Sequence, residues 1–288
     1  MNECPVPSVV VEASVATTTT GEYAVQKWQD DSVSQIIDCI AEEVPIALVY
    51  NGISHAVMLA SPSDLSDFAI GFSFTEGIIR QLSDIYDIEE VPQSNGVELH
   101  ITIATECFQN LKEKRRSMTG RTGCGLCGAE SLGQAMRIPQ VKFDAQSDGL
   151  LLLDAETINR AAETLKTRQQ LQNQTGATHA SAWVDAQGQV LLVREDVGRH
   201  NALDKLIGAV LSQKIDKRGF VITTSRASYE MVQKTASAGI AVLVAISAPT
   251  GLAVRIAKQC GMTLIGFTRP HQHVVYCGIE RMKYKEIA

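Results

Sequence analysis

The chain has 288 residues, with 26 basic against 32 acidic side chains and a formal net charge of −6. Hydrophobic residues make up 45% and charged residues 20% of it, which is typical of a folded globular protein. An acidic molecule repels nucleic acids and anionic membranes unless a local patch overrides its field. Aromatic residues, at 5%, also disfavour a stacking surface for single strands. We therefore expect no nucleic-acid or membrane partner, and any anionic ligand must be bound by local donors.

The apolar runs and the cysteines predict a cytoplasmic protein. The first residues do not resemble a signal peptide, and residues 239–247, among the longest apolar segments, fall far short of the roughly 20 that cross a bilayer. Seven cysteines, an odd number, do not indicate a disulfide framework. In a reducing compartment a close pair such as Cys124 and Cys127 is more often catalytic or metal-binding.

The first part of the chain predicts a mobile tail over residues 1–24 and a small α+β domain over residues 25–111. Residues 46–60 form two β-like runs around Asn51-Gly52, a strong hairpin signal. Ser61 is expected to cap the helix that follows, with Pro62 at its first position. Residues 96–104 alternate as a half-buried strand.

Residues 112–150 are predicted to be a glycine-rich loop and linker. From Lys112 to Gly133 the periodicity is lost, and the sequence is first basic and then rich in glycine. The stretch RTGCGLCGAES, residues 121–131, lies inside this segment and carries both close cysteines. Long connections of this kind within a compact protein are usually functional.

Residues 151–288 predict a second, larger α/β domain. A helix capped at Asp154 is followed by two strands around Gln187-Gly188, and then helices and strands alternate to residue 268. Such alternation favours parallel strands joined by right-handed crossovers, with helices on both faces of the sheet. We therefore expect a three-layer α/β sandwich.

Three strand ends in this domain carry groups that can bind an anion. They are TTSRAS (223–228), SAPTG (247–251) and FTRPHQH (267–273). In open α/β sheets, ligands bind at the carboxyl ends of strands, where helix N-termini offer free N–H groups. A phosphate-bearing ligand is thus expected there, with Ser225, Arg226 and Arg269 among its contacts. The alternative is that Ser225, Ser228 and Thr250 only cap helices.

The cysteine pair admits several interpretations. A structural zinc site needs four ligands, and no second CxxC unit accompanies Cys124 and Cys127, although a site that includes His271 and His273 stays open. The zinc deaminase signature is absent, and the flanking glycines are a poor helix start for a thioredoxin-like couple. A sulfur nucleophile that visits two partners suits a flexible loop. Basic residues upstream would favour its thiolate, although they could also be a solvated loop: Lys112, Lys114, Arg115, Arg116 and Arg121.

Five separated motifs carry a resemblance to a known family. They are RTGCGLCG (121–128), TGATHASAW (175–183), REDVGRHNALDKLIG (194–208), SRASYEMVQK (225–234) and GFTRPHQHVVY (266–276). In this order they resemble the FdhD/NarQ family of formate dehydrogenase accessory sulfurtransferases. The resemblance covers residues from about 45 to 283.

This resemblance implies a cytosolic homodimer whose larger domain has a cytidine-deaminase-like fold without the deaminase zinc site, and no permanent metal is expected. It also implies that a cysteine desulfurase delivers sulfur as a persulfide, which passes to the bis-molybdopterin guanine dinucleotide cofactor of formate dehydrogenase. Cys124 would carry the persulfide, with Cys127 as its partner. The segment expected to contact the cofactor is Phe267, Thr268, Arg269, Pro270, His271 and Gln272.

Two points stay open at this level. The chain could instead be a non-catalytic chaperone that binds the cofactor and closes a redox-active or zinc-binding CxxC loop. Arg199 and His200 could contact the anionic ligand or be structural, with Asp196 capping the helix that follows. His179, within a predicted strand, is interpreted as a hydrogen-bonded core imidazole and not as a ligand.

Overall fold

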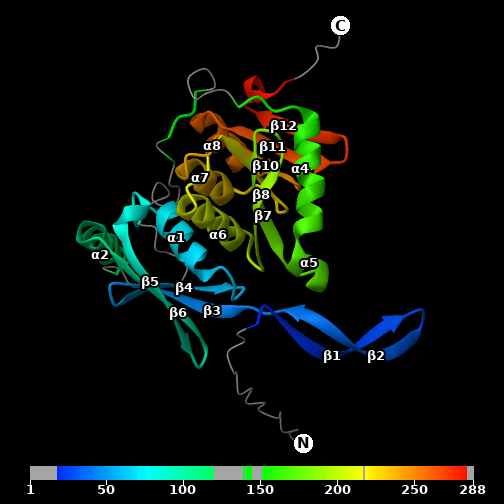
Figure 1. The fold of residues 1–288 in the computed structure, drawn as a ribbon, viewed down its shortest axis with the longest axis horizontal. Coiled ribbons are helices and arrows are strands. Elements are labelled where there is room, and N and C mark those ends of the chain that lie inside the picture. Colours follow the sequence, from blue (N-terminus) through cyan, green and yellow to red (C-terminus); the bar gives the residue numbers. More distant parts are fainter. Residues whose placement is uncertain (1–17, 120–138, 140, 145–150, 217, 284–288) are drawn as a thin grey trace, which may run out of the picture.

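The computed structural model describes residues 18–119, 139, 141–144, 151–216 and 218–283, with the backbone alone for residues 114–119. Two sheets and their helices form the body of the molecule, and a two-stranded arm extends from it (Figure 1). No helix in the described ranges is long and apolar enough to cross a membrane.

A six-stranded sheet in the order β12-β11-β10-β9-β7-β8 forms the centre of the larger unit. Its strands are β7 (His179–Asp185), β8 (Val190–Asp196), β9 (Gly219–Thr223), β10 (Val242–Ala245), β11 (Thr263–Arg269) and β12 (Gln272–Cys277). The central strands β9, β10 and β11 are parallel, as the alternation of helices and strands predicts. β12 was not predicted; it pairs antiparallel with β11 at one edge.

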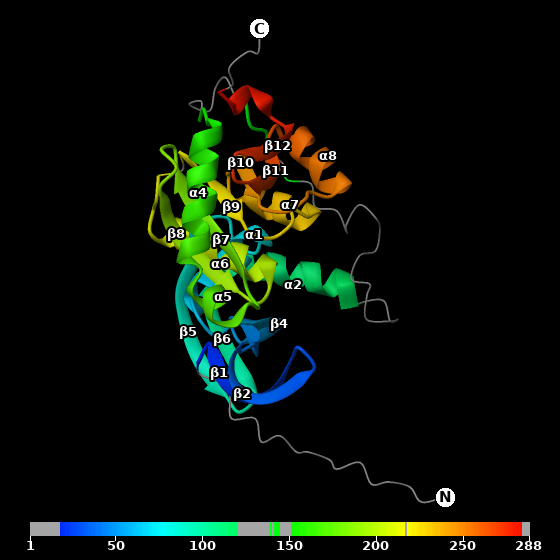
Figure 2. The same ribbon diagram turned by 90° about the vertical axis from the view of Figure 1, so that its right-hand side faces the viewer.

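Helices cover both faces of this sheet, which confirms the predicted three layers (Figures 1 and 2). The helices are α4 (Ala155–Arg168), α5 (Gln170–Thr175), α6 (Arg199–Ser212), α7 (Tyr229–Ser237) and α8 (Gly251–Cys260). One core joins α6, α7 and α8 to residues such as Trp183 and Leu243, and the other joins α4 to residues such as Phe220 and Val244. Each fully buried apolar side chain contributes about 1.5–3 kcal/mol. The likeness to cytidine deaminases stays a prediction.

The smaller unit is a four-stranded sheet in the order β4-β3-β6-β5. Its elements are β3 (Val44–Tyr50), β4 (Ile53–Ala60), α1 (Leu65–Thr75), a 3₁₀ turn (Leu82–Asp84), β5 (Ile85–Gln93), β6 (Gly96–Ile103) and α2 (Thr105–Thr119). The predicted hairpin is confirmed, since Asn51 and Gly52 have φ angles of 46° and 82° between β3 and β4. Both values are those of the tight hairpin turn that this dipeptide favours.

The predicted start of the first helix is wrong. Asp64, not Ser61, is the N-cap of α1. Ser61 is fully buried, and its N–H and C=O groups bind Asp196 and Lys205 of the larger unit at 3.0 and 2.9 Å. Ser61, which the local sequence predicts to be a helix cap, is therefore used in a tertiary contact instead.

Two predicted loop segments contain regular structure. The tail predicted over residues 1–24 overlaps β1 (Thr20–Gln29), which pairs with β2 (Ser32–Ala41) as a projecting arm (Figure 1). The segment predicted to be a loop from residue 112 is helical as far as Thr119, where α2 ends. Residues 1–17 and 120–138 lie outside the described part of the chain, and the remaining domain boundaries stay predictions.

Helices α1 and α6 cross closely where the two units meet. A methyl group on Gly71 would lie 1.8 Å from the carbonyl oxygen of Asp204, and one on Gly208 would lie 1.9 Å from that of Asp67. Only glycine permits backbones to approach this closely. This crossing holds the smaller unit against α6.

Candidate functional site

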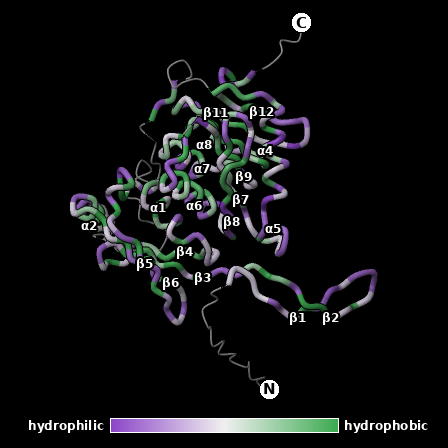
Figure 3. The backbone as a smooth tube through the Cα atoms, viewed as in Figure 1, coloured by the Kyte–Doolittle hydropathy of each residue, from purple (hydrophilic) through white to green (hydrophobic). Residues whose placement is uncertain are grey.

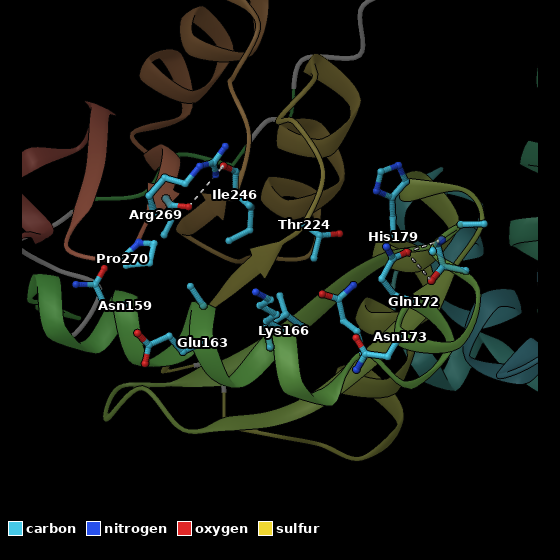
Figure 4. Close-up of a pocket in the computed structure, with 17 residues that line it drawn as sticks. Asn159, Glu163, Lys166, Gln172, Asn173, His179, Thr224, Ile246, Arg269 and Pro270 are labelled. Carbon is cyan, nitrogen blue, oxygen red and sulfur yellow. Dashed lines mark hydrogen bonds between the residues drawn. The ribbon is translucent and has the colours of Figure 1, made fainter. Parts of the chain in front are cut away.

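A cavity of about 930 Å³ lies at the carboxyl edge of β9, β10 and β11, with α4 and α5 as its opposite wall (Figure 4). The sheet edge contributes Thr224, Ile246, Thr268 and Arg269, while the helical wall contributes residues including Lys166, Gln172 and Asn173. Crevices at the carboxyl ends of parallel strands are where open α/β sheets bind ligands. The site predicted at these strand ends thus coincides with a large cavity.

The turn between β11 and β12 places Arg269 at the cavity. Phe267 and His271 have φ angles of 51° and 60°, which non-glycine residues rarely adopt, and a register shift separates Gly266 from Arg269. Thr268 is buried, and its hydroxyl donates to the carbonyl of Ala245 at 3.1 Å. The irregular backbone therefore turns Thr268 inward and holds the neighbouring arginine at the sheet edge.

The guanidinium of Arg269 is anchored by backbone carbonyls. Nη1 donates to Ile246 at 2.6 Å and to Thr268 at 3.0 Å (Figure 4). Among the described residues, the Nε and Nη2 edge has no partner. Because a guanidinium fork binds phosphate or carboxylate oxygens bidentately, this fixed edge suits an anionic ligand.

Only part of the segment predicted to contact the cofactor, residues 267–272, lines the cavity. Thr268, Arg269 and Pro270 line it, whereas His271 lies in an adjoining groove that shares Asn159 and Glu163 with the cavity. Phe267 and Gln272 are exposed and are not among the residues that line either space. The contacts predicted for these two side chains and for His271 stay predictions.

Ser225 and Arg226 do not line the cavity either. Ser225 is buried, and its hydroxyl donates to the carbonyl of Arg226 at 3.0 Å, so it is engaged locally. Arg226 is exposed on the loop before α7. Of the three candidate caps, Ser228 and Thr250 are the N-caps of α7 and α8, and the Thr250 hydroxyl accepts from the N–H of Ala253 at 3.3 Å.

Sequence reasoning missed the helical wall and His179. Polar side chains at the inner surface of α4 and in α5 contribute to the cavity: Asn159, Glu163, Lys166, Gln172 and Asn173. Their pattern is that of any solvated helix face, so no local signal identifies them. The prediction for His179 differs from the structure, because this half-buried residue lines the cavity at the start of β7, and no hydrogen bond of its ring is recorded among the described residues.

Arg199 and His200 occupy the first turn of α6, near His179. The imidazole of His200 is 2.8 Å from the Glu230 carboxylate, and Asp196 accepts the N–H of Gly198, the N-cap of α6, at 2.7 Å. The hydrogen bond from His200 holds the pKa of Glu230 below its usual range. Asp196 therefore supports the helix start as expected, while His200 pairs with an acid on α7.

Cys124 and Cys127 lie outside the described residues, so their surroundings are not defined. Within the described ranges, no three His, Cys, Asp or Glu side chains are grouped in a way that could hold a metal ion. The described thiols of Cys107, Cys260 and Cys277 have pKa values raised mainly by burial. These three are therefore poorer nucleophiles than an exposed thiol beside cations would be.

Comparison with known proteins shows the family of this chain. The sequence model of the FdhD/NarQ family matches residues 41–283. The chain belongs to this family. A Cupriavidus necator protein named sulfur carrier protein FdhD is 53% identical over 281 residues, covering 97% of this chain and 95% of that protein. A protein of the same name from Bordetella petrii is 51% identical over 249 residues, covering 86% of this chain and 88% of its own.

A solved structure shares the fold of this chain. The crystal structure of a candidate formate dehydrogenase accessory protein from Desulfotalea psychrophila superposes with a TM-score of 0.71 at 24% identity. It covers 92% of this chain and 100% of the other. The arrangement of sheets and helices is therefore shared along nearly the whole chain.

Proposed function

We propose that this FdhD/NarQ member is a sulfur carrier for the maturation of formate dehydrogenase, and that it acts in the cytoplasm. Relatives over nearly the full length carry the name sulfur carrier protein. The observation that carries the proposal is the cavity at the sheet edge, which contains Thr268, Arg269 and Pro270 of the segment expected to contact the cofactor. The proposed ligand is the bis-molybdopterin guanine dinucleotide cofactor, bound as a substrate.

The sulfur is proposed to travel on Cys124. The Cys124 thiolate attacks the terminal sulfur of the persulfide on a cysteine desulfurase, so the desulfurase leaves as a thiolate and Cys124 becomes a persulfide. The Cys127 thiolate then attacks the inner sulfur of Cys124. The terminal sulfur departs as hydrosulfide toward the cofactor, and a Cys124–Cys127 disulfide forms. Two cellular thiol groups then reduce this disulfide by exchange and leave as a disulfide of their own, which restores both cysteines. This route explains why two cysteines are placed three positions apart.

The cavity is proposed to hold the polyanionic end of the cofactor. Arg269 offers a fixed pair of N–H groups at the sheet edge, and Lys166 adds a cation from the opposite wall. Since the whole chain is acidic, such local donors are needed to bind phosphate groups. Amide side chains such as Asn173 can pair with a nucleotide base.

We further propose that the protein is a homodimer joined through the β1–β2 arm. The arm exposes apolar residues, with Trp28, Val33 and Ile37 on one face. Figure 3 shows hydrophobic stretches along the arm. A two-stranded hairpin is only marginally stable by itself in water. An arm of this length with exposed apolar residues is therefore expected to pack against another protein surface, which we propose is a second copy of the chain.

The experiment that tests sulfur carriage is the intact mass of the protein after incubation with a cysteine desulfurase and cysteine. The wild type should gain about one sulfur atom that a reductant removes. Cys124→Ala should lose this gain, and Cys39→Ala, in the β1–β2 arm, should keep it. Cys127→Ala should retain the added sulfur for longer, because the thiol that releases it is missing.

The opposite result would favour a different role. If the wild type gains no sulfur and binds zinc through the CxxC loop, the protein is a cofactor-binding chaperone. In that case Cys124→Ala should reduce formate dehydrogenase activation only mildly. A variant that cannot bind the cofactor should lose this activation.

A further inference from the structure

Helix α5 forms part of the cavity wall, although it is too short to be stable by itself. It spans six residues, Gln170–Thr175, and two of them, Gln172 and Asn173, line the cavity. Isolated helices shorter than about 12 residues are marginal in water, so contacts from outside must set the position of this one. A residue that anchors α5 therefore also places part of the wall.

The first turn of α5 has no side-chain cap from its own segment. Its first internal hydrogen bond joins the N–H of Asn173 to the carbonyl of Gln169 at 3.0 Å. Within this described helix, the earlier N–H groups of Leu171 and Gln172 therefore have no partner. Gln169, the N-cap, makes no side-chain cap hydrogen bond in the described part of the chain. These two N–H groups need an acceptor from another element.

Glu195 of β8 supplies this acceptor. Its Oε2 atom accepts the N–H of Leu171 at 2.9 Å, and its Oε1 atom accepts the N–H of Gln172 at 2.8 Å. Oε1 also accepts the Thr178 hydroxyl at 3.2 Å, from beyond the other end of α5. The Gln172 side chain closes the same segment, because its Oε1 atom accepts the N–H of Thr178 at 2.8 Å. One carboxylate thus holds both ends of α5 against β8.

Glu195 acts from behind the wall. It is not among the described residues that line the cavity, so its effect on a ligand there passes through α5. Its negative charge by itself would disfavour an anionic ligand nearby. Its hydrogen bonds would favour the ligand, because they fix the wall before binding and reduce the ordering that binding requires. The charge and the hydrogen bonds of Glu195 therefore predict opposite effects on affinity.

We propose that Glu195 is a positioning residue for the nucleotide base, which it affects by holding α5 in place. This inference rests on the proposed function, in which Arg269 and Lys166 bind phosphate groups and Asn173 pairs with a base. Figure 4 shows Asn173 and Arg269 toward opposite ends of the cavity. Glu195 should therefore govern the affinity for the base and not the affinity for phosphate groups alone.

The test is a calorimetric titration of the wild type and Glu195→Gln with two probes, guanosine diphosphate and inorganic pyrophosphate. Glutamine keeps one acceptor oxygen, but its NH₂ group cannot accept, so one N–H group of α5 loses its partner. Guanosine diphosphate should bind about tenfold more weakly, as expected for the loss of one hydrogen bond to a charged group. Pyrophosphate should bind no more weakly than it binds the wild type.

The matched control is Glu98→Gln, which removes the same charge from β6 of the small sheet. Glu98 pairs with His100 at 2.8 Å and does not line the cavity among the described residues. This variant should leave both affinities unchanged.

Amide hydrogen exchange, followed by NMR, gives a second readout at the anchor itself. N–H groups in the first turn of a helix exchange quickly unless an acceptor outside the helix protects them. Glu195→Ala should speed the exchange of the Leu171 and Gln172 amides and leave the amides of β9 at their wild-type rates. Faster exchange in β9 as well would mean that the substitution loosens the whole sheet, which would contradict a local positioning role.

The outcomes separate the inference from the proposed function. If Glu195→Gln binds guanosine diphosphate as tightly as the wild type or more tightly, the charge outweighs the hydrogen bonds, and the positioning role is wrong while the cavity ligand stands. An equal loss of affinity for both probes would also overturn it, because the effect would not be confined to the base. A wild type that binds neither probe would overturn both the inference and the proposed cofactor cavity.

Discussion

Asp196 and Lys205 form a fully buried ion pair that ties the two units together. Their charged atoms are 2.7 Å apart, and both side chains have no exposed surface. Asp196 also accepts the N–H of Ser61, and Lys205 donates to the Ser61 carbonyl. Since every charge has several partners, the desolvation cost of burial is offset, and the β4–α1 connection is fixed against α6.

Replacing Lys205 by methionine should strongly destabilise the protein. The substitution keeps an apolar stem of similar length but leaves the Asp196 carboxylate buried without its counter-charge, so the free energy of unfolding should fall by about 3–5 kcal/mol. Urea unfolding followed by circular dichroism measures this. Arg218→Met, which removes a fully exposed partner of Asp216, should cause no resolvable change. Equal effects of the two substitutions would show that the buried pair has no special role.

For single residues, the sequence predicts the roles that depend on near neighbours in the chain and not those that depend on distant segments. The sequence indicates Asp154 as a helix cap and Thr250 as a candidate cap. Both capping hydrogen bonds join residues only three positions apart, so local sequence is enough to predict them. Ser61 was misassigned and His179 was interpreted as a core residue, because their surroundings depend on segments far away in the chain. Arg269 was correctly expected at the sheet edge, since its position follows from the strand order.

At the level of elements, the same distinction between local and distant determinants holds. The sequence predicts the Asn51-Gly52 hairpin and the helices α4, α6, α7 and α8, which carry strong local patterns, but not the short helix α5. The β1–β2 arm was missed because its strands do not alternate between a core face and a solvent face. Its turn uses Asp30 and Asp31 at φ angles of 47° and 59°, a weaker turn signal than Asn-Gly.

The crossing of α1 and α6 predicts a clear effect of adding single methyl groups. Gly71→Ala and Gly208→Ala should each destabilise the protein by about 1–3 kcal/mol or more, because the new carbon would meet a backbone carbonyl that a side-chain rotation cannot move. At separations of 1.8 and 1.9 Å the cost lies at the upper end of this range, so it exceeds the gain of about 1 kcal/mol that alanine brings to a helix. Thermal unfolding of the purified variants measures the difference.

Gly251, at the start of α8, provides the control for this prediction. A methyl group added at Gly251 would have Nη1 of Arg255 as its nearest atom, at 3.6 Å, which is an ordinary van der Waals contact. Gly251→Ala should therefore be neutral or stabilising. A uniform response of all three glycines would mean that the close approach of α1 and α6 does not limit stability.

For the whole molecule, the fold places the cavity in the larger unit while the cysteine pair follows α2 of the smaller unit. The cavity draws on both the sheet edge and the helices α4 and α5, so it depends on the complete three-layer packing. The alternation of strands and helices in the sequence predicts its sheet side, at the strand ends that include Thr224 and Arg269. The helical side requires the tertiary structure, because it is built from ordinary polar helix residues.

The oligomeric state tests the role of the β1–β2 arm. Trp28 and Ile37 are 70% and 65% exposed on the same face of the arm, and burying them against a second copy would remove a large apolar area from water. We expect the wild type to sediment as a dimer and the double substitution Trp28→Ser, Ile37→Ser to shift it to monomer at micromolar concentration. Tyr86→Ser, which removes a 68% exposed aromatic residue from β5, should leave the dimer intact. A monomeric wild type, or a dimer that survives the double substitution, would show that the arm does not join two copies of the chain.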